Sequence, residues 1–209
     1  DLASELFQKY FSPEILPDYW NFASLTLREK DLLFLSRNEF YAPFCKALIA
    51  LKNGDKKRAC DLLETADAKG NIPLLFFAAR ILGENGRNQA ALNKYAQIPL
   101  ESPYQIAVLL NRAELFAEKG DFSEALISAG QAYKISPEVP EVQLCYADKL
   151  YKAGKLILIP DVLILASGQK YRQQFETLWV AGMQERIKQC NLNTQKEKIR
   201  EFCRQLLAV

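Results

Sequence analysis

Apolar and small residues recur at helical spacing through most of the chain, and the clearest example runs from Ile106 to Val139. Each half of this stretch carries one stripe on a single helical face, made first by Leu109, Ala113 and Phe116 and then by Ala125, Ala129 and Ala132. Two such stripes separated by a short polar break predict two antiparallel helices that pack face to face. The small residues let the two backbones approach each other, and we expect Leu109, Phe116 and Phe122 to fill the remaining gap.

The break between the two stripes lies at Gly120 and Asp121. We expect Gly120 to leave the first helix with a positive φ and Asp121 to cap the second helix. Pro137 has no amide proton to donate, so it is expected to close the second helix. A single hairpin of this size buries too little apolar surface to offset the entropy lost on ordering it, and the pattern therefore predicts neighbouring hairpins.

Regularly spaced glycines mark those neighbours. The turn glycines are 32, 34 and 34 residues apart: Gly54, Gly86, Gly120 and Gly154. Seven residues before each of them lies an alanine: Ala47, Ala79, Ala113 and Ala147. Aligned positions before and after the glycines are again alanine or another apolar residue. Columns that stay in phase with the turns predict four consecutive hairpins.

In these residues the chain resembles the tetratricopeptide repeat family, whose pattern spaces Leu, Gly or Ala, Tyr, Ala, Phe and Pro over 34 residues. The best copy matches that pattern at Leu109, Ala113, Phe116, Gly120, Phe122, Ala125, Ala132 and Pro137. The preceding copy matches it at Leu75, Ala79, Leu82, Gly86, Ala91, Tyr95 and Pro103. The repeats are degenerate, because no copy has the leading Trp and because Asn88 and Arg112 depart from the pattern. The resemblance covers about Glu39 to Tyr171.

The resemblance implies an all-α fold, a right-handed α-solenoid of antiparallel helix hairpins with capping helices at both ends. We expect one domain over residues 1–209, because stacked repeats tend to form a single body in which each unit contacts only its neighbours. Its expected parts are an N-terminal helical cap or eroded repeat at 1–38, four hairpins at 39–171 and a C-terminal helical cap at 172–209.

The second helix of the last hairpin is irregular. The segment Leu156–Ala166 is apolar on nearly every side and contains Pro160, which a helix tolerates only in its first turn. We therefore expect this helix to start late, near Pro160. A helix that is apolar all round must be covered all round. Burial under the following helix is the preferred interpretation, and self-association of the chain through this segment is the alternative.

Bulky aromatic residues are frequent at the N-terminal end, from Phe7 to Phe44. They are expected to seal the open end of the array, and a ligand-stacking surface is the alternative. Thr26 and Glu29 form a capping-box candidate that would start a helix reaching Arg37.

At the C-terminal end an amphipathic helix is expected from Tyr171 to Cys190. A second one should follow a capping box at Thr194 and Glu197. A basic amphipathic helix can bind a membrane or an acidic partner, but a capping helix laid on the last hairpin is the preferred interpretation.

The amino-acid composition limits which ligands and which kinds of catalysis are expected for this chain. The chain has 209 residues with a net charge of +2, too little positive charge for a dedicated nucleic-acid binder, so no nucleic-acid partner is expected. Histidine is absent, which removes the usual general base and the commonest metal ligand. The five cysteines are far apart, so we expect no metal site and no cofactor: Cys45, Cys60, Cys145, Cys190 and Cys203. Cys45, Cys60 and Cys145 stand in repeat columns and resemble small core residues.

No apolar run reaches the roughly 20 residues that a spanning helix needs, so no direct membrane insertion is expected. The sequence starts at Asp1 and contains one methionine, Met183, which indicates a fragment or a processed chain. The compartment stays open. The odd number of cysteines favours the cytoplasm, and a periplasmic or membrane-tethered protein is the alternative if an upstream segment was removed.

In the tetratricopeptide family the first helix of each pair lines a concave groove that binds peptides. The residues expected to face this groove are offset from the core stripe: Phe76, Arg80, Leu110, Asn111, Glu114, Leu144, Asp148 and Tyr151. Family members that bind chaperones clamp a C-terminal carboxylate with Lys, Asn and Arg. Here only Asn111 matches that clamp, while Phe76, Glu141 and Cys145 stand at other clamp positions, so no such clamp is expected.

The leading hypothesis is therefore a non-catalytic scaffold or adaptor that binds a segment of another protein in the groove. A regulatory or spacer domain of a larger enzyme or membrane-bound assembly is the alternative. A third hypothesis makes Glu114 and Asp148 an acid–base pair, which their spacing does not require. We expect no catalytic residues.

Overall fold

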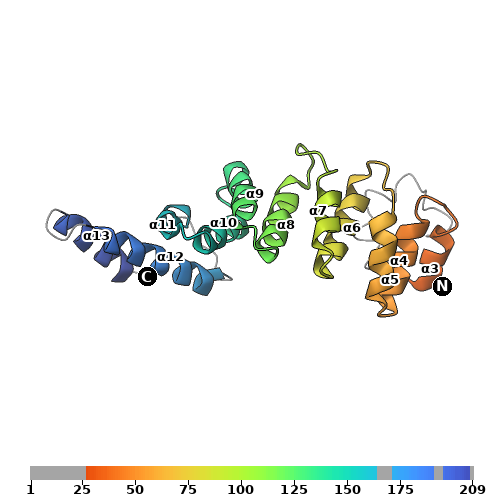
Figure 1. Cartoon of the computed structure of the whole chain (residues 1–209), viewed down its shortest axis with the longest axis horizontal. Coiled ribbons are helices and arrows are strands. Elements are labelled where there is room, and N and C mark those ends of the chain that lie inside the picture. Colours follow the sequence, from red (N-terminus) through yellow and green to blue (C-terminus); the bar gives the residue numbers. More distant parts are fainter. Residues whose placement is uncertain (1–26, 164–170, 191–194, 208–209) are drawn as a thin grey trace. The chain divides into compact units, whose positions relative to one another are not determined.

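The chain is all-α. The computed structural model describes residues 27–163, 171–190 and 195–207, which form eleven α-helices and one short 3₁₀ helix and no β-strand (Figure 1). Packing divides the chain into two compact units, Asp1–Val108 and Leu109–Val209, and each is described by itself. A single domain over 1–209 and a right-handed solenoid stay predictions. The expectations for Phe7, Thr26 and Thr194 lie outside the described residues.

The first unit consists of two hairpins preceded by one short helix: α3 (Glu29–Leu35), α4 (Ala42–Lys52), α5 (Lys56–Thr65), α6 (Ile72–Glu84) and α7 (Asn88–Tyr95). Within it α4 packs on α5 and α6 packs on α7, as the ribbon in Figure 1 shows. The second helices of the two hairpins also touch, since Arg87 lies 3.1 Å from Asp61 and the Lys94 ammonium donates to the Ala66 carbonyl at 2.6 Å.

Glycine turns and buried alanines explain these hairpins. Gly54 and Gly86 have φ values of +79° and +77°, a conformation that a Cβ would strain. Asp55 then caps α5 by accepting the amide proton of Arg58 at 3.0 Å. The repeat alanines in both helices of each hairpin are fully buried: Ala47, Ala59, Ala79 and Ala91.

α3 begins two residues later than a cap at Thr26 would place it. The helix begins at Glu29 with Arg28 as its N-cap, and the Arg28 amide donates to Asp31 at 3.3 Å. The helix ends at Leu35 rather than Arg37. Asp31, which also forms an ion pair with Arg28, therefore plays the part expected of Glu29.

In the second unit the hairpins continue and then become irregular: α8 (Gln105–Glu118), α9 (Phe122–Ile135), α10 (Pro140–Lys152), the 3₁₀ helix η2 (Leu156–Leu158), α11 (Ile159–Val162), α12 (Arg172–Lys188) and α13 (Lys196–Leu207). α8 contributes residues to both units. α9 packs on α10, and α12 packs on α10, α11 and α13.

The turn glycine, the helix cap and the helix end predicted for the hairpin at Gly120 are confirmed. Gly120 has a φ of +79°, Asp121 accepts the amide proton of Glu124 at 3.2 Å, and α9 ends two residues before Pro137. The prediction that Phe122 fills the gap between the helices is wrong, because its side chain is 41% exposed. The Phe122 ring stands at the first position of α9, where the buried alanine stripe has not yet begun.

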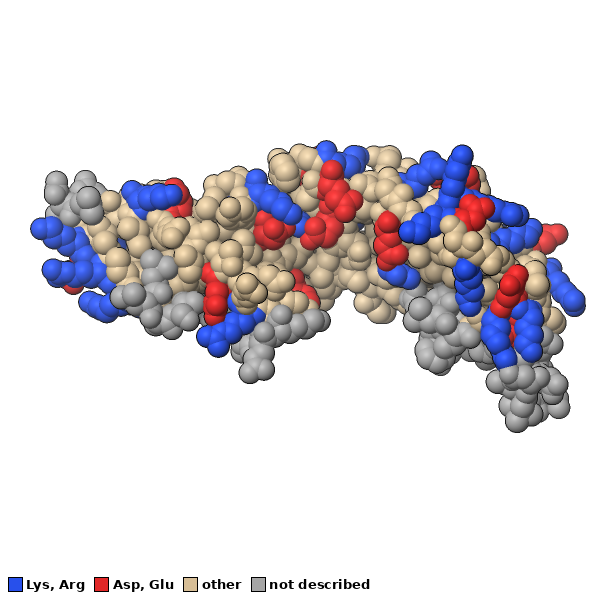
Figure 2. Space-filling view, turned by 90° about the horizontal axis from the view of Figure 1, so that it is seen from below, with Lys and Arg blue, Asp and Glu red and all other residues tan. Residues whose placement is uncertain are grey.

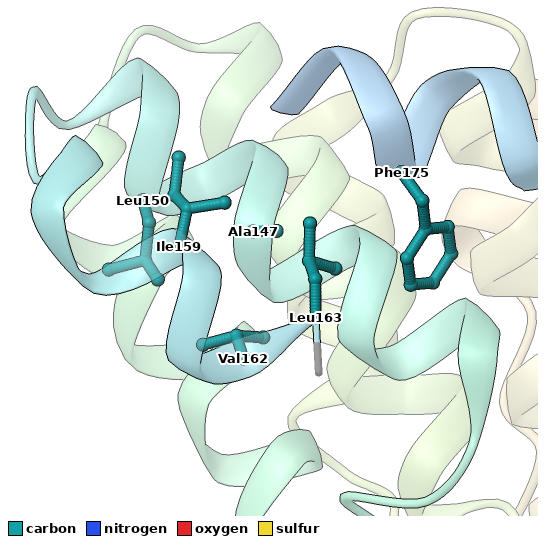
Figure 3. Packing of buried hydrophobic residues seen from close by; sticks show 6 residues of the cluster. All are labelled: Ala147, Leu150, Ile159, Val162, Leu163 and Phe175. Atoms are coloured by element: carbon teal, nitrogen blue, oxygen red, sulfur yellow. The ribbon is translucent and has the colours of Figure 1, made fainter. Parts of the chain in front are cut away.

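The late start after Gly154 is confirmed, since Pro160 is the second residue of α11. The buried part of this segment joins α10 and α12 in one apolar cluster, formed by Ala147, Leu150, Ile159, Val162, Leu163 and Phe175 (Figure 3). Burial is therefore confirmed for Ile159–Leu163 except Asp161, whereas Ile157 and Leu158 are exposed. Self-association through Leu156–Ala166 stays a prediction.

The helix expected at Tyr171–Cys190 is confirmed as α12, which crosses α11 very closely at Gly182. A Cβ added at Gly182 would lie 2.6 Å from Pro160 Cδ and 2.8 Å from the Leu156 carbonyl oxygen. Gly182 follows Ala147 by 35 residues and so continues the column of small residues. With α13 packed on it, α12 acts as the first helix of a fifth hairpin.

Candidate functional site

Three first helices of the second unit, α8, α10 and α12, line a pocket of about 600 Å³. Its described lining combines apolar, amide, hydroxyl and carboxylate side chains: Glu114, Glu141, Leu144, Cys145, Asp148, Tyr171, Gln173, Gln174, Thr177 and Leu178. Residues one helical turn apart on α10 point the same way, so Glu141, Leu144, Cys145 and Asp148 form one face of that helix. Leu144 also packs against the apolar cluster that contains Ala147 and Leu150, so this face borders the core.

Lys149 ties α8 to α10 beside this pocket. Its side chain is 1% exposed, and its ammonium lies 2.6 Å from Glu114 Oε1 on α8 and 2.7 Å from Asp148 Oδ2 on its own helix. Lys152 reaches the same Asp148 oxygen at 2.9 Å. A buried ammonium is stable only when it is paired, and two carboxylates supply that pairing.

The ion pairs keep both partners charged. Burial lowers the pKa of Lys149, but hydrogen bonds from its ammonium to Asp148 and Glu114 outweigh burial, and the pKa lies above its ordinary value. Burial likewise raises the pKa of Asp148, but hydrogen bonds and charges from Lys149 and Lys152 outweigh it, and the pKa lies below its ordinary value. At neutral pH the pocket therefore borders a fixed pattern of charges.

Cys145 contributes an unreactive thiol to the pocket wall. Its Sγ lies 3.8 Å from Glu114 Oε1, and burial together with that carboxylate raises the pKa of Cys145 to about 12. A thiol with that pKa is protonated at neutral pH and is a poor nucleophile. Cys45 and Cys60 are buried, as expected for small core residues.

Tyr171 and Glu141 join α12 to α10 at the edge of the pocket. The Tyr171 hydroxyl donates to Glu141 Oε1 at 2.8 Å. Tyr171 directly precedes the first residue of α12, so this hydrogen bond fixes the helix start against α10.

The structure brings together three of the eight residues predicted to face the groove, namely Glu114, Leu144 and Asp148. Tyr151 is exposed on α10 but does not belong to the described lining. Leu110 and Asn111 are half-buried on α8.

The two predicted residues of the first unit make local contacts on α6. The Phe76 ring lies 4.9 Å from that of Tyr104 and 5.8 Å from that of Tyr95, measured between centroids. Arg80 forms an ion pair with Glu84 at 2.9 Å, one helical turn along. Phe76 is therefore part of an aromatic cluster.

The prediction missed Lys149 and every residue that α12 contributes. Lys149 stands five residues before its turn glycine, where the other copies have Ile49, Ile81 and Leu115, and a lysine in an apolar column is the signal that could have found it. The contribution of α12 to the site was missed because no turn glycine follows this helix, although Gly182 follows Ala147 by 35 residues, close to the spacing of the other small residues.

No protein-family model matches the sequence, and no curated protein matches it. The resemblance to tetratricopeptide repeats thus rests on the repeat columns alone. Within the described ranges no three Cys, Asp or Glu side chains gather closely enough to hold a metal ion. No helix in those ranges is both long and apolar enough to cross a membrane.

Proposed function

We propose that the chain is a non-catalytic scaffold that holds a segment of another protein across the first helices α8, α10 and α12. The observation that supports this proposal most directly is the pocket itself, because three successive first helices contribute to it. A surface built from consecutive repeats suits an extended ligand, which can contact one helix after another.

The lining chemistry fits a polypeptide. Leu144 and Leu178 offer apolar contact, while Gln173, Gln174 and Thr177 offer the donors and acceptors that a peptide backbone needs. Nucleic acid fits poorly. On the face shown in Figure 2, Lys and Arg side chains are interspersed with Asp and Glu and form no continuous basic track for phosphates.

A catalytic role for Glu114 and Asp148 is the second candidate, because both line the pocket. An acid–base pair needs one group that is protonated near neutral pH. The lowered pKa of Asp148 keeps that carboxylate ionised, and both groups are engaged by Lys149. The ion pairs therefore favour a binding role. The alternative of a regulatory or spacer domain in a larger assembly is compatible with binding at the same pocket.

The proposal is tested by selecting binders from a phage-displayed library of random linear peptides against the folded chain. The pocket variant is Thr177→Trp, which adds a large ring at an exposed lining position. The matched control is Ser123→Trp, which changes another exposed hydroxyl residue, on α9, that is not among the described lining residues.

Peptides that bind the unmodified chain and Ser123→Trp but not Thr177→Trp are the expected result. Peptides that bind all three equally, or a failure to select any peptide, would overturn the proposal. Circular dichroism and thermal unfolding establish that both variants are folded.

A further inference from the structure

The charged side chains that line the pocket, among those described, are all negative. Three of the described lining residues carry carboxylates: Glu114, Glu141 and Asp148. No described lining residue is Lys or Arg. Two cations balance these carboxylates. Lys149 lies underneath, because it is 1% exposed whereas the Glu114 side chain is 55% exposed and that of Asp148 33% exposed. Lys152, which is 41% exposed, pairs with Asp148 alone among the described side chains. A ligand that approaches Glu114 therefore meets carboxylate oxygens before it meets the Lys149 ammonium.

Among these carboxylates Glu114 is the best placed to accept a second partner. Lys149 engages its Oε1 atom, and more than half of the side chain still faces solvent. Asp148 is already shared between Lys149 and Lys152 through one oxygen, and Glu141 accepts the Tyr171 hydroxyl. Lys149 also fixes the Glu114 rotamer, so the carboxylate is oriented before a ligand arrives.

Next to Glu114 the wall is apolar. Cys145 of α10 contacts Glu114, and Leu144 of α10 and Leu178 of α12 are also among the lining residues, partly buried against the apolar cluster. A lysine or arginine side chain has the matching construction, because a chain of methylene groups carries a cationic head. Such a side chain can lay its methylene groups on Leu144 and Leu178 and direct its donors to Glu114.

We propose that the pocket recognises a Lys or Arg side chain of the bound protein segment, with Glu114 as the residue that selects the positive charge. This inference rests on the proposed scaffold function and specifies its partner: a segment in which a basic residue stands beside apolar ones. An acidic segment is disfavoured, because like charges would face each other in the pocket.

The peptide selection described above supplies the first test. Peptides whose binding depends on the pocket should be enriched in Lys or Arg. This enrichment should fall when the selection is repeated with Glu114→Gln. The control is Glu124→Gln, which removes the same charge from an exposed position on α9. Binding to that control should keep the enrichment.

A defined probe then measures the charge directly. One selected peptide is synthesised with its arginine and again with citrulline, which keeps the shape of the side chain but lacks the charge. The citrulline peptide should bind the unmodified chain about three- to tenfold more weakly. The two peptides should differ less than about twofold on Glu114→Gln, because the charge has lost its partner.

The outcomes separate the two proposals. Pocket-dependent peptides without enriched basic residues, or a citrulline peptide that binds as well as its parent, overturn the charge selection and leave the scaffold in place. The absence of any pocket-dependent peptide overturns the scaffold. If Glu114→Gln fails to fold, the comparison of arginine and citrulline on the unmodified chain still decides.

Discussion

The hairpin α6–α7 and the hairpin formed by α10, η2 and α11 begin from the same repeat unit and end differently. Both turn at a glycine, Gly86 or Gly154, with φ values of +77° and +71°. Both bury the alanine seven residues earlier, Ala79 or Ala147, completely. In the regular hairpin an eight-residue helix follows the turn, whereas in the irregular one a 3₁₀ turn and a four-residue helix follow it.

The first helices differ most at the column five residues before the turn. Ile81 occupies it in α6 and is 7% exposed, whereas Lys149 occupies it in α10 and is even less exposed. The preceding residue differs accordingly, because Asp148 supplies a carboxylate where α6 has Arg80. The comparison teaches that the glycine and alanine columns maintain the hairpin, and that the departures from the repeat coincide with the pocket.

Substitutions at the position five residues before the turn glycine should have the largest effect on stability, and they test the comparison most directly. Ile81→Lys would bury an ammonium beside Arg80 with no carboxylate on the preceding residue, and it should lower the free energy of unfolding by about 3–5 kcal/mol. Lys149→Met should change it by no more than about 1 kcal/mol, because a buried ion pair can be replaced by an apolar side chain at little cost. Urea unfolding followed by circular dichroism measures both. Equal losses would show that the column is not specialised.

The irregular hairpin should also depend on a close contact that the regular one lacks. Gly182→Ala should cost about 1–3 kcal/mol, because its Cβ would overlap Pro160 and the Leu156 carbonyl oxygen. Gly130→Ala in α9 is the matched control, since the atoms nearest to its Cβ would belong to the Tyr146 side chain, the first at 3.3 Å. The control should cost less, because that ring can move and alanine favours the helix. A smaller loss at Gly182 than at Gly130 in thermal unfolding would contradict the packing of α12 on α11.

The turns, in contrast, should respond alike in both hairpins. Gly86→Ala and Gly154→Ala should each cost about 1–2 kcal/mol, because an L-residue resists positive φ. A Cβ at either glycine meets no atom within 4 Å, so the cost is conformational and not steric. The two melting curves should shift by similar amounts. A cost at only one of the glycines would show that the two turns are not equivalent.

Much of the fold could be predicted from the sequence because its determinants are local. Gly120 and Pro137 mark a turn and a helix end through backbone chemistry that depends little on the surroundings, and Pro160 sets the late start of α11 in the same way. Phe122 was misjudged because its exposure depends on where the packing begins, which helical spacing does not reveal. The cap of α3 was missed because Thr26 and Glu29, two residues before Arg28 and Asp31, form an equally plausible capping pair in the sequence.

The candidate site was harder to predict from the sequence, since it depends on contacts between helices that are far apart in the chain. Glu114, Leu144 and Asp148 were found because the repeat assigns them to one side of each first helix. The burial of Lys149 depends on Glu114, which is 35 residues away on another helix, and no local pattern encodes that pairing. The contribution of α12 to the pocket depends on the close approach of Gly182 to Pro160, which only the packed structure reveals.

The smallest expected effect concerns the pH dependence of stability, and it tests the carboxylate that pairs with Lys149 in α10. The folded-state pKa of Asp148 lies below its ordinary value of 3.8, so the carboxylate stabilises the folded chain above that pH, and the contribution disappears as the pH falls through the folded-state pKa. Asp148→Asn should therefore be less stable than the unmodified chain near neutral pH, by up to about 1 kcal/mol because the group is partly exposed. The difference should shrink as the pH falls below 3.8 and through the lower folded-state pKa, where the Asp148 carboxyl becomes protonated and neutral like the asparagine amide. Urea unfolding at several pH values measures it, with Glu84→Gln, whose carboxylate pairs with Arg80 on the exposed side of α6, as the control. A gap between Asp148→Asn and the unmodified chain that stays constant down to the most acidic pH would show that Asp148 acts through its shape and not through its charge.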